Sequence, residues 1–224
     1  MSKVFVSTSP FCEHNSFPLT AFEEAGHELV LNSLGRKLHE SEILELSSGC
    51  VGLIAGTERL STDFFAKQKD LGFVCRVGIG LDGLPLNYCR ENNITLSYTP
   101  DAPAPAVAEL SLGLAIALLR GIVSSDQNMR KGLWERVAGL RLAEITIGMI
   151  GVGRIGSRVL RRLAPFGSPR VLVNDISHTD DSLIPGLKLN WVDKKTIYRE
   201  ADLIFIHVPL TPLTKNMIGH SELG

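Results

Sequence analysis

The sequence has no long uninterrupted run of apolar residues. Its longest run lies between Glu109 and Arg120 and contains ten residues, whereas a helix that crosses a bilayer needs about 20. The N-terminal segment carries one basic residue and a short strand-like run, without an apolar core followed by a small-residue cleavage site. These absences argue against a membrane span and a secretory signal, and they predict a cytoplasmic protein.

The sequence is also poor in cysteine. Its four cysteines, Cys12, Cys50, Cys75 and Cys89, are widely spaced and form no CxxC pair. This spacing offers no framework for a metal site and fits reduced thiols. Each cysteine is expected to be a small buried hydrophobe, and no metal is expected.

Neither sign of charge dominates. The 23 basic and 24 acidic residues give a net charge of -1 and are intermixed along the chain, which argues against nucleic acid or a membrane surface as a partner. A small molecule is the expected partner. With 224 residues, 44% of them hydrophobic, the chain can bury one or two substantial cores.

Short β-branched runs alternate with helical patterns in the first hundred residues. Such a βα repeat predicts a parallel sheet. The expected strands are Val4–Val6, His27–Leu31, Val51–Ala55, Phe73–Cys75 and Ile94–Tyr98, and the expected helices are Leu19–Ala25, Ser41–Leu46, Ser61–Leu71 and Leu86–Asn92.

A proline-rich segment then interrupts the repeat. Thr99–Pro105 holds three prolines, which end the preceding strand and stiffen the chain. We therefore predict two domains, residues 1–99 and 100–224. The second begins with an apolar helix over Ala106–Arg120, expected to be buried on most of its surface, and a more polar helix over Gly121–Gly132.

A second βα series follows. Three strands can be identified in it, while a complete dinucleotide-binding sheet conventionally has six, so this domain is expected to be an N-terminal half. The strands are Ile145–Ile150, Val171–Asn174 and Leu203–Val208, and the helices are Arg154–Phe166 and Asp193–Glu200.

A glycine motif, Gly151-Val-Gly-Arg-Ile-Gly156, directly follows an apolar strand and opens an amphipathic helix. This context distinguishes a dinucleotide-binding GxGxxG motif from a chance match. Gly151 suits a tight turn, Gly153 lets the backbone touch a pyrophosphate, and Gly156 permits close packing. The alternative is a turn that only needs flexible glycines. It does not explain why the motif lies between an apolar strand and an amphipathic helix.

Asp175 ends the next strand, 19 positions after Gly156. A carboxylate at this place can accept hydrogen bonds from both ribose hydroxyls of an adenosine. The neighbouring residues include no arginine to pair with a 2'-phosphate, which favours NAD over NADP. Alternatively, Asp175 is only a turn residue at a strand end.

Several motifs together resemble the D-2-hydroxyacid dehydrogenase family, in particular its phosphoglycerate dehydrogenase branch. The resemblance covers nearly the whole chain in the correct order, and it implies a flavodoxin-like parallel-sheet substrate domain followed by an incomplete Rossmann-type NAD-binding domain. The motifs are Arg76-Val-Gly-Ile-Gly-Leu-Asp82, Thr99-Pro100, Val107-Ala-Glu-Leu110, Gly132-Leu-Trp-Glu-Arg136, Gly148-Met-Ile-Gly-Val-Gly-Arg-Ile-Gly156 and Phe205-Ile-His-Val-Pro-Leu-Thr-Pro212.

The resemblance implies further cofactor contacts. The backbone amides of Arg154 and Ile155 would hold the pyrophosphate, and Val107 would flank the nicotinamide. The adenosine side would be lined by His207, Val208 and Pro209, with Thr214 as a further contact. For His207, whose place at a strand end also invites a general-base role, the resemblance implies cofactor packing instead.

In the first domain, the backbone of Val77, Gly78 and Ile79 resembles the loop that holds the substrate carboxylate. Close amides in a glycine-rich loop can receive an anion. Arg76 beside it could grip a substrate phosphate or second carboxylate, or could form a surface salt bridge. Trp134 is expected to be a packing anchor between domains or subunits rather than a ligand contact.

The resemblance implies hydride transfer between NAD and a D-2-hydroxy or 2-keto acid, with a 3-phosphoglycerate-like substrate as the best single prediction. The family's arginine, histidine and glutamate would lie beyond Gly224, so no catalytic residue is expected within the chain, and the chain is expected to be inactive alone, as part of a longer enzyme. A homodimer is expected. The alternative is a non-catalytic NAD-sensing protein, similar to the family's corepressor relatives, that dimerises through Ala106–Met129.

Overall fold

The computed structural model describes residues 1–178 and 184–223 of the chain. It divides into two compact units, Met1–Ala102 and Pro103–Gly224. The boundary predicted between residues 99 and 100 lies three residues before this division, inside the same proline-rich segment. Each unit has its own sheet and its own hydrophobic core.

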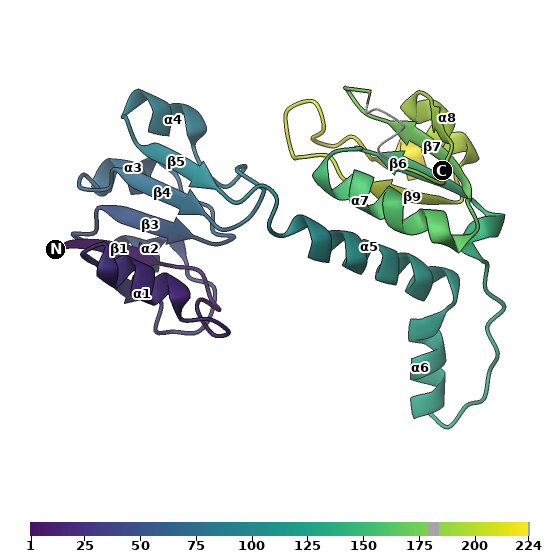
Figure 1. Ribbon diagram of the computed structural model, residues 1–224, viewed down its shortest axis with the longest axis horizontal. Coiled ribbons are helices and arrows are strands. Elements are labelled where there is room, and N and C mark those ends of the chain that lie inside the picture. The colour runs from purple at the N-terminus through teal and green to yellow at the C-terminus, as the bar shows by residue number, and fades with distance from the viewer. Residues whose placement is uncertain (179–183, 224) are drawn as a thin grey trace. The chain divides into compact units, whose positions relative to one another are not determined.

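The first unit contains a parallel sheet of five strands in the order β2-β1-β3-β4-β5 (Figure 1). This is the order of a flavodoxin-like fold. Each predicted strand is present, with ends shifted by at most two residues: β1 is Ser2–Val6, β2 is His27–Leu31, β3 is Gly52–Ala55, β4 is Phe73–Arg76 and β5 is Thr95–Tyr98.

Helices cover both faces of this sheet. Because successive side chains in a strand point to opposite faces, Val4 and Val6 pack with Phe22 on one face, while Phe5 packs against the remaining helices on the other. The first face is covered by α1 (Phe17–Glu24) and the second by α2 (Glu40–Leu46), α3 (Thr62–Lys67) and α4 (Leu86–Glu91).

Helix α3 is shorter than predicted. Its start is as expected, because the Ser61 hydroxyl accepts a hydrogen bond from the Phe64 amide. It ends at Lys67 rather than Leu71, since Gln68 leaves the helical conformation with ψ near 69°. The Gln68 side chain instead donates to the Leu44 carbonyl at 2.7 Å and the Ser47 hydroxyl at 2.8 Å.

The second unit contains a parallel sheet in the order β8-β7-β6-β9. The sequence identified three of these strands, β6 (Thr146–Ile150), β7 (Arg170–Asn174) and β9 (Leu203–Ile206). It missed β8, Leu189–Trp191, which pairs with Val171–Val173. A three-residue segment is too short to show the periodicity by which strands are recognised.

Helices lie on both faces of the second sheet as well. Helix α5 (Ala104–Leu119) lies along α7 (Arg154–Leu163) on one face (Figure 1), and α8 (Lys194–Glu200) covers the other. A Cβ on Gly148 of β6 would lie 2.5 Å from the Ile197 side chain of α8, so this helix needs glycine there. The remaining segments are α6 (Ile122–Arg130), α9 (His220–Leu223) and two 3-10 turns, Leu142–Glu144 and Ala164–Phe166.

The prediction that the apolar helix is buried on most of its surface is wrong within this chain. In α5 only Ala104, Ala108 and Ala115 are buried. Its larger side chains Leu114 and Leu118 are 60% and 72% exposed. Small residues face α7 because they allow close helix contact. Leu112 and Leu119 pack against the core, while Leu110, Leu114 and Leu118 are exposed in the described part of the chain.

Among the described residues, no single helix is long and apolar enough to cross a membrane. Helices α5 and α6 reach that length and composition only when taken together, and they are bent by 63° at the break between them.

Candidate functional site

The glycine loop connects β6 to α7 at the carboxyl edge of the second sheet. Gly151 has φ near +98°, a conformation that side chains disfavour. A Cβ there would lie 2.6 Å from the carbonyl of His207 and 3.0 Å from the Val208 side chain. Glycine is therefore required where this loop passes the end of β9.

The other two motif glycines meet different constraints. A Cβ on Gly156 would overlap the carbonyl oxygen of Gly151. Gly156 therefore lets the first turn of α7 pack directly against the start of the loop. Gly153 has nothing within 4 Å of its Cβ position and is the N-cap of α7. The amides of Arg154 and Ile155 follow in the first helical turn, where backbone donors have no acceptor within the helix. This arrangement leaves an open, electropositive place for a phosphate.

Asp175 lies beside the glycine loop. One carboxylate oxygen accepts a hydrogen bond from the Val152 amide at 2.6 Å, and the other accepts from the Ser177 amide at 3.2 Å. The carboxylate is thus held in a fixed orientation at the end of β7. Its oxygens have further lone pairs that can accept ribose hydroxyls, the role predicted for it.

The segment after β9 carries the remaining predicted cofactor residues. Val208, Pro209 and Thr214 line a cavity of about 370 Å³. The Thr214 hydroxyl donates to the Pro209 carbonyl at 2.6 Å and accepts from the Thr211 amide at 2.8 Å. Thr214 therefore closes the turn that shapes this cavity, in addition to the contact predicted for it.

His207 directly follows β9 and is partly buried. Its amide donates to the Ile150 carbonyl at 2.8 Å, and its ring stacks on Phe205 with centroids 6.2 Å apart. The ring nitrogen Nε2 is buried and has no hydrogen-bond partner among the described residues. Burial lowers the pKa of His207 below its ordinary value. The imidazole is thus neutral near pH 7, which suits packing against a cofactor.

The lowered pKa of His207 makes a prediction for stability. As the pH falls through about 6.5, the unfolded chain takes up a proton that the folded chain resists, so the free energy of unfolding decreases. We expect His207→Phe to reduce this loss between neutral and mildly acidic pH, measured as the melting temperature at several pH values. His220→Phe, at an exposed position of the same unit, is the control. Equal pH profiles for His207→Phe and the wild type would contradict this account.

In the first unit, the loop after β4 holds the predicted substrate residues. The Val77 amide donates to the Ala55 carbonyl at 2.8 Å, and the Gly78 amide donates to the Thr99 hydroxyl at 2.8 Å. Two of the three amides predicted to hold a carboxylate are therefore engaged within the protein. Among the hydrogen bonds described for this loop, none uses the Ile79 amide. This amide can therefore still bind an anion. The role of Thr99 in holding Gly78 was not predicted.

Arg76 is buried, with 8% of its surface exposed. Its Nε donates to the Gly80 carbonyl at 3.0 Å, and its Nη1 is buried without a hydrogen-bond partner among the described residues. The alternative of a surface salt bridge is therefore wrong. A buried guanidinium with a free donor is instead suited to receive an acceptor group from a ligand.

The second unit thus brings Gly151, Gly153, Gly156 and Asp175 together around one loop, with the cavity after β9 next to it. Val107 lies near the N-terminal end of α5, where its carbonyl accepts from the Ser111 hydroxyl at 2.7 Å. No hydrogen bond joins Val107 to the glycine loop among the described residues, and its place beside the nicotinamide stays a prediction.

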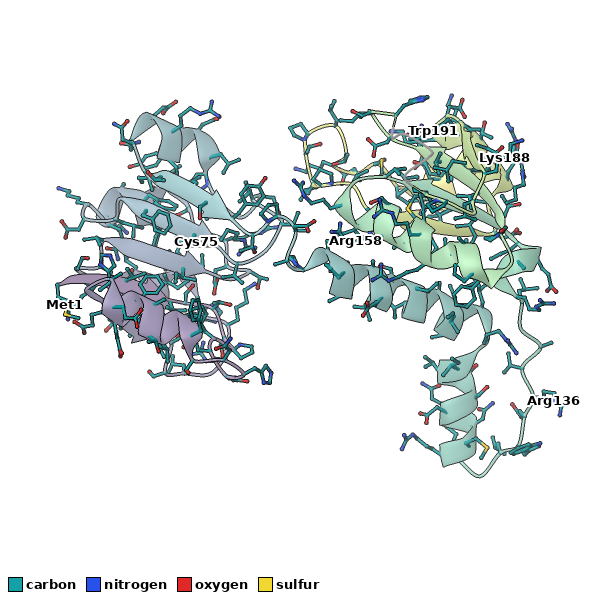
Figure 2. All side chains as sticks on the ribbon, in the orientation of Figure 1. Met1, Cys75, Arg136, Arg158, Lys188 and Trp191 are labelled. Carbon is teal, nitrogen blue, oxygen red and sulfur yellow. The ribbon has the colours of Figure 1, made fainter. Side chains whose placement is uncertain are left out.

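Two features at these edges were not predicted. His178 stacks on Trp191 with ring centroids 4.3 Å apart. This contact joins the segment after β7 to the end of the unpredicted strand β8, where Figure 2 labels Trp191. In the first unit, Glu58 is 3% exposed. No pattern in the sequence marks a buried glutamate in a loop, since burial there depends on the neighbouring loops.

Comparison with known proteins identifies the class. The sequence model of the D-isomer specific 2-hydroxyacid dehydrogenase, NAD binding domain, matches residues 112–224. The chain belongs to the D-isomer specific 2-hydroxyacid dehydrogenase family, a family of oxidoreductases, and its cofactor is NAD.

Individual relatives agree with this class. The hydroxypyruvate reductase of Thermotoga maritima is 33% identical over 77% of this chain and 55% of its own length. The D-3-phosphoglycerate dehydrogenase of Methanocaldococcus jannaschii is 30% identical over 100% of this chain and 42% of its own length. The crystal structure of the TT0316 protein from Thermus thermophilus superimposes with a TM-score of 0.84 at 30% identity, covering 99% of this chain and 69% of that one. The chain thus spans about half the length of these curated relatives.

Proposed function

We propose that this protein takes part in hydride transfer between NAD and a D-2-hydroxy acid or its 2-keto acid. The observation that carries the proposal is the glycine loop, where Gly153 is open to a ligand at the N-terminus of α7. Bound NADH supplies the hydride for the carbonyl carbon of the keto acid. The protein's part is to bind and orient the two molecules and to exclude water.

The geometry of the second unit supports the cofactor-binding roles predicted for its residues. The amides of Arg154 and Ile155 would hold the pyrophosphate, and the fixed carboxylate of Asp175 would accept the ribose hydroxyls. The adenosine side would lie against Val208 and Pro209 at the cavity after β9, with the neutral ring of His207 packed behind it. These assignments remain proposals residue by residue.

The substrate roles are proposed for the first unit. The Ile79 amide and the loop around Gly78 would receive the carboxylate of the acid. Arg76, buried with a free Nη1, would by itself favour the 3-phosphoglycerate-like substrate predicted from the sequence, because its charge attracts a phosphate. The buried carboxylate of Glu58 has the opposite charge and would repel a phosphate.

The proton-transfer residues of the family are not assigned to any position in residues 1–224. We therefore expect this chain alone to bind NAD without turnover. The cytoplasmic location likewise stays a prediction.

The test uses the product of the complete gene with NADH and a panel of 2-keto acids, including glyoxylate, pyruvate, hydroxypyruvate and phosphohydroxypyruvate. Loss of NADH absorbance with at least one acid is expected. If no acid is reduced, the enzymatic proposal fails. Tight NADH binding coupled to a change in mass, without turnover, would instead support the non-catalytic NAD-sensing protein.

We also propose that the protein is a homodimer, joined through the face of α5 that carries Leu110, Leu114 and Leu118. These side chains are 62%, 60% and 72% exposed, and Trp134 is 83% exposed. An apolar face of this kind marks an interaction site. An apolar hollow of about 430 Å³, lined in part by Leu114 and Leu118 together with Val123 of α6, continues the same face.

Leu114→Glu is expected to convert the dimer to a monomer, because a carboxylate would be buried without a partner at the centre of the interface. Light scattering during size-exclusion chromatography measures the mass. Leu34→Glu, which also replaces a half-exposed leucine but lies in the first unit, should leave the mass unchanged. A Leu114→Glu variant that stays dimeric would show that this face is not the interface.

A further inference from the structure

Two buried side chains of opposite charge lie in the first unit. Glu58 is 3% exposed and Arg76 is 8% exposed. Each has one buried atom without a hydrogen-bond partner among the described residues, Oε2 of Glu58 and Nη1 of Arg76. No ion pair joins the two side chains in the described ranges. The fold therefore holds an unused acceptor and an unused donor away from water, an arrangement that costs stability unless a ligand pairs them.

The sheet topology brings these groups to one edge. In the order β2-β1-β3-β4-β5 the winding direction reverses between β1 and β3, and ligands of open parallel sheets bind outside the carboxyl ends of the strands at such a point. Glu58 follows β3, and Arg76 ends β4 directly opposite Ala55, the last residue of β3. Cys75, which precedes Arg76, marks the course of β4 in Figure 2.

Gly56 shows how closely this edge is packed. A Cβ on Gly56 would lie 2.7 Å from the hydroxyl oxygen of Thr8 and 3.2 Å from Oε2 of Glu58. Oxygens from the loops after β1 and β3 therefore border the same glycine. The nearby ammonium of Lys37 donates to the Thr57 carbonyl at 3.0 Å, while Oε2 of Glu58 is left without a partner.

We propose that Glu58 and Arg76 determine specificity by recognising a hydroxyl on carbon 3 of the acid. This inference rests on the proposed function, which places the acid at this edge. A hydroxyl can donate its hydrogen to Oε2 of Glu58 and accept a hydrogen bond from Nη1 of Arg76, so one group pairs both atoms. A methyl group or a hydrogen at that carbon pairs neither.

The same charges disfavour a phosphorylated acid. A phosphate carries close to two negative charges at neutral pH, and a buried carboxylate beside it is a like charge in a medium that screens poorly. Arg76 alone would favour the phosphate, but Glu58 offsets that attraction. The preferred substrate class is therefore a 3-hydroxy-2-keto acid of the hydroxypyruvate type rather than a phosphorylated one.

The experiment compares kcat/KM of the complete gene product for hydroxypyruvate, pyruvate and phosphohydroxypyruvate. Hydroxypyruvate and pyruvate differ only in the hydroxyl on carbon 3. We expect a preference of about tenfold or more for hydroxypyruvate over pyruvate, because a site built for a hydroxyl is left with unpaired groups by the analogue that lacks it. Phosphohydroxypyruvate should also be the poorer substrate.

Two variants separate the hydrogen bond from the charge. Glu58→Gln keeps a carbonyl acceptor, so it should retain the preference for hydroxypyruvate over pyruvate while improving kcat/KM for phosphohydroxypyruvate. Glu58→Met, similar in size but without an acceptor, should lose both discriminations. Glu45→Met, at an exposed position of the same unit, should change neither.

The outcomes distinguish the two proposals. If no 2-keto acid is reduced, the proposed function fails, and this inference fails with it. If acids are reduced but hydroxypyruvate is not preferred to pyruvate, or if Glu58→Gln and Glu58→Met behave like the wild type, the role of Glu58 is refuted while the dehydrogenase proposal stands. If circular dichroism shows that Glu58→Met does not fold, the substrate preference of the wild type and the behaviour of Glu58→Gln are enough to test the role of Glu58.

Discussion

Gly153→Ala is expected to leave the second unit folded and to weaken NAD binding by about tenfold or more, a loss of roughly 1.4 kcal/mol or more of binding free energy. Among the described residues, Gly153 has no neighbour within 4 Å of the added Cβ, so the new methyl group causes no clash with them in the free protein. In the complex it occupies the space where the backbone must approach the pyrophosphate. Calorimetric titration with NAD measures the binding, and thermal unfolding measures the stability.

Gly156→Ala should behave differently. Its Cβ would overlap the Gly151 carbonyl oxygen, so we expect a lower melting temperature as well as weaker NAD binding. Gly113→Ala is the matched control, because its Cβ also has nothing within 4 Å and it lies inside helix α5, where alanine is favoured over glycine. If Gly153→Ala binds NAD as tightly as Gly113→Ala does, the pyrophosphate does not lie at this loop.

Asp175→Ala is expected to weaken NAD binding by about tenfold and to reduce or remove the preference for NAD over NADP, since a hydrogen bond to a charged group contributes about 1.5–3 kcal/mol. The carboxylate would lose its bonds to ribose hydroxyls, and its negative charge would no longer repel a 2'-phosphate. Titrations with NAD and with NADP measure both affinities.

A second substitution controls for the structural role of Asp175. Asp175→Asn can still accept the hydrogen bond from the Val152 amide, which the carboxylate now accepts at 2.6 Å, but it lacks the charge. It loses the bond from the Ser177 amide, so we expect a smaller fall in melting temperature than for Asp175→Ala, together with a shift of the preference toward NADP. An unchanged ratio of the two affinities in both variants would mean that Asp175 only closes the loop and does not select the cofactor.

The sequence predicted the strand-loop-helix arrangement of the glycine motif well because the requirements of that turn are local. Gly151 adopts a positive φ and Gly156 packs on the Gly151 carbonyl, and such constraints within one turn appear directly as a residue pattern. The strand before the loop and the helix after it have strong periodicity, and both were found within two residues of their N-terminal ends. Strand β8 was missed because its three residues are too few to show a periodic pattern.

The substrate loop was predicted less completely. Its glycine-rich pattern indicated an anion site, but the sequence could not show that the amides of Val77 and Gly78 are used by Ala55 and Thr99. These partners are 22 and 21 positions away along the chain. Hydrogen bonds at that separation depend on strand order and register, which no local pattern specifies.

What the sequence determined by itself is the class of fold, the division near the prolines, and the glycine loop from Gly151 to Gly156 with Asp175 beside it. Only the tertiary structure decided that Arg76 and Glu58 are buried with unpaired atoms, and that Leu110, Leu114 and Leu118 of α5 are exposed. The physical reason is that a turn is governed by its own backbone, whereas burial is governed by whichever distant segments pack over a residue.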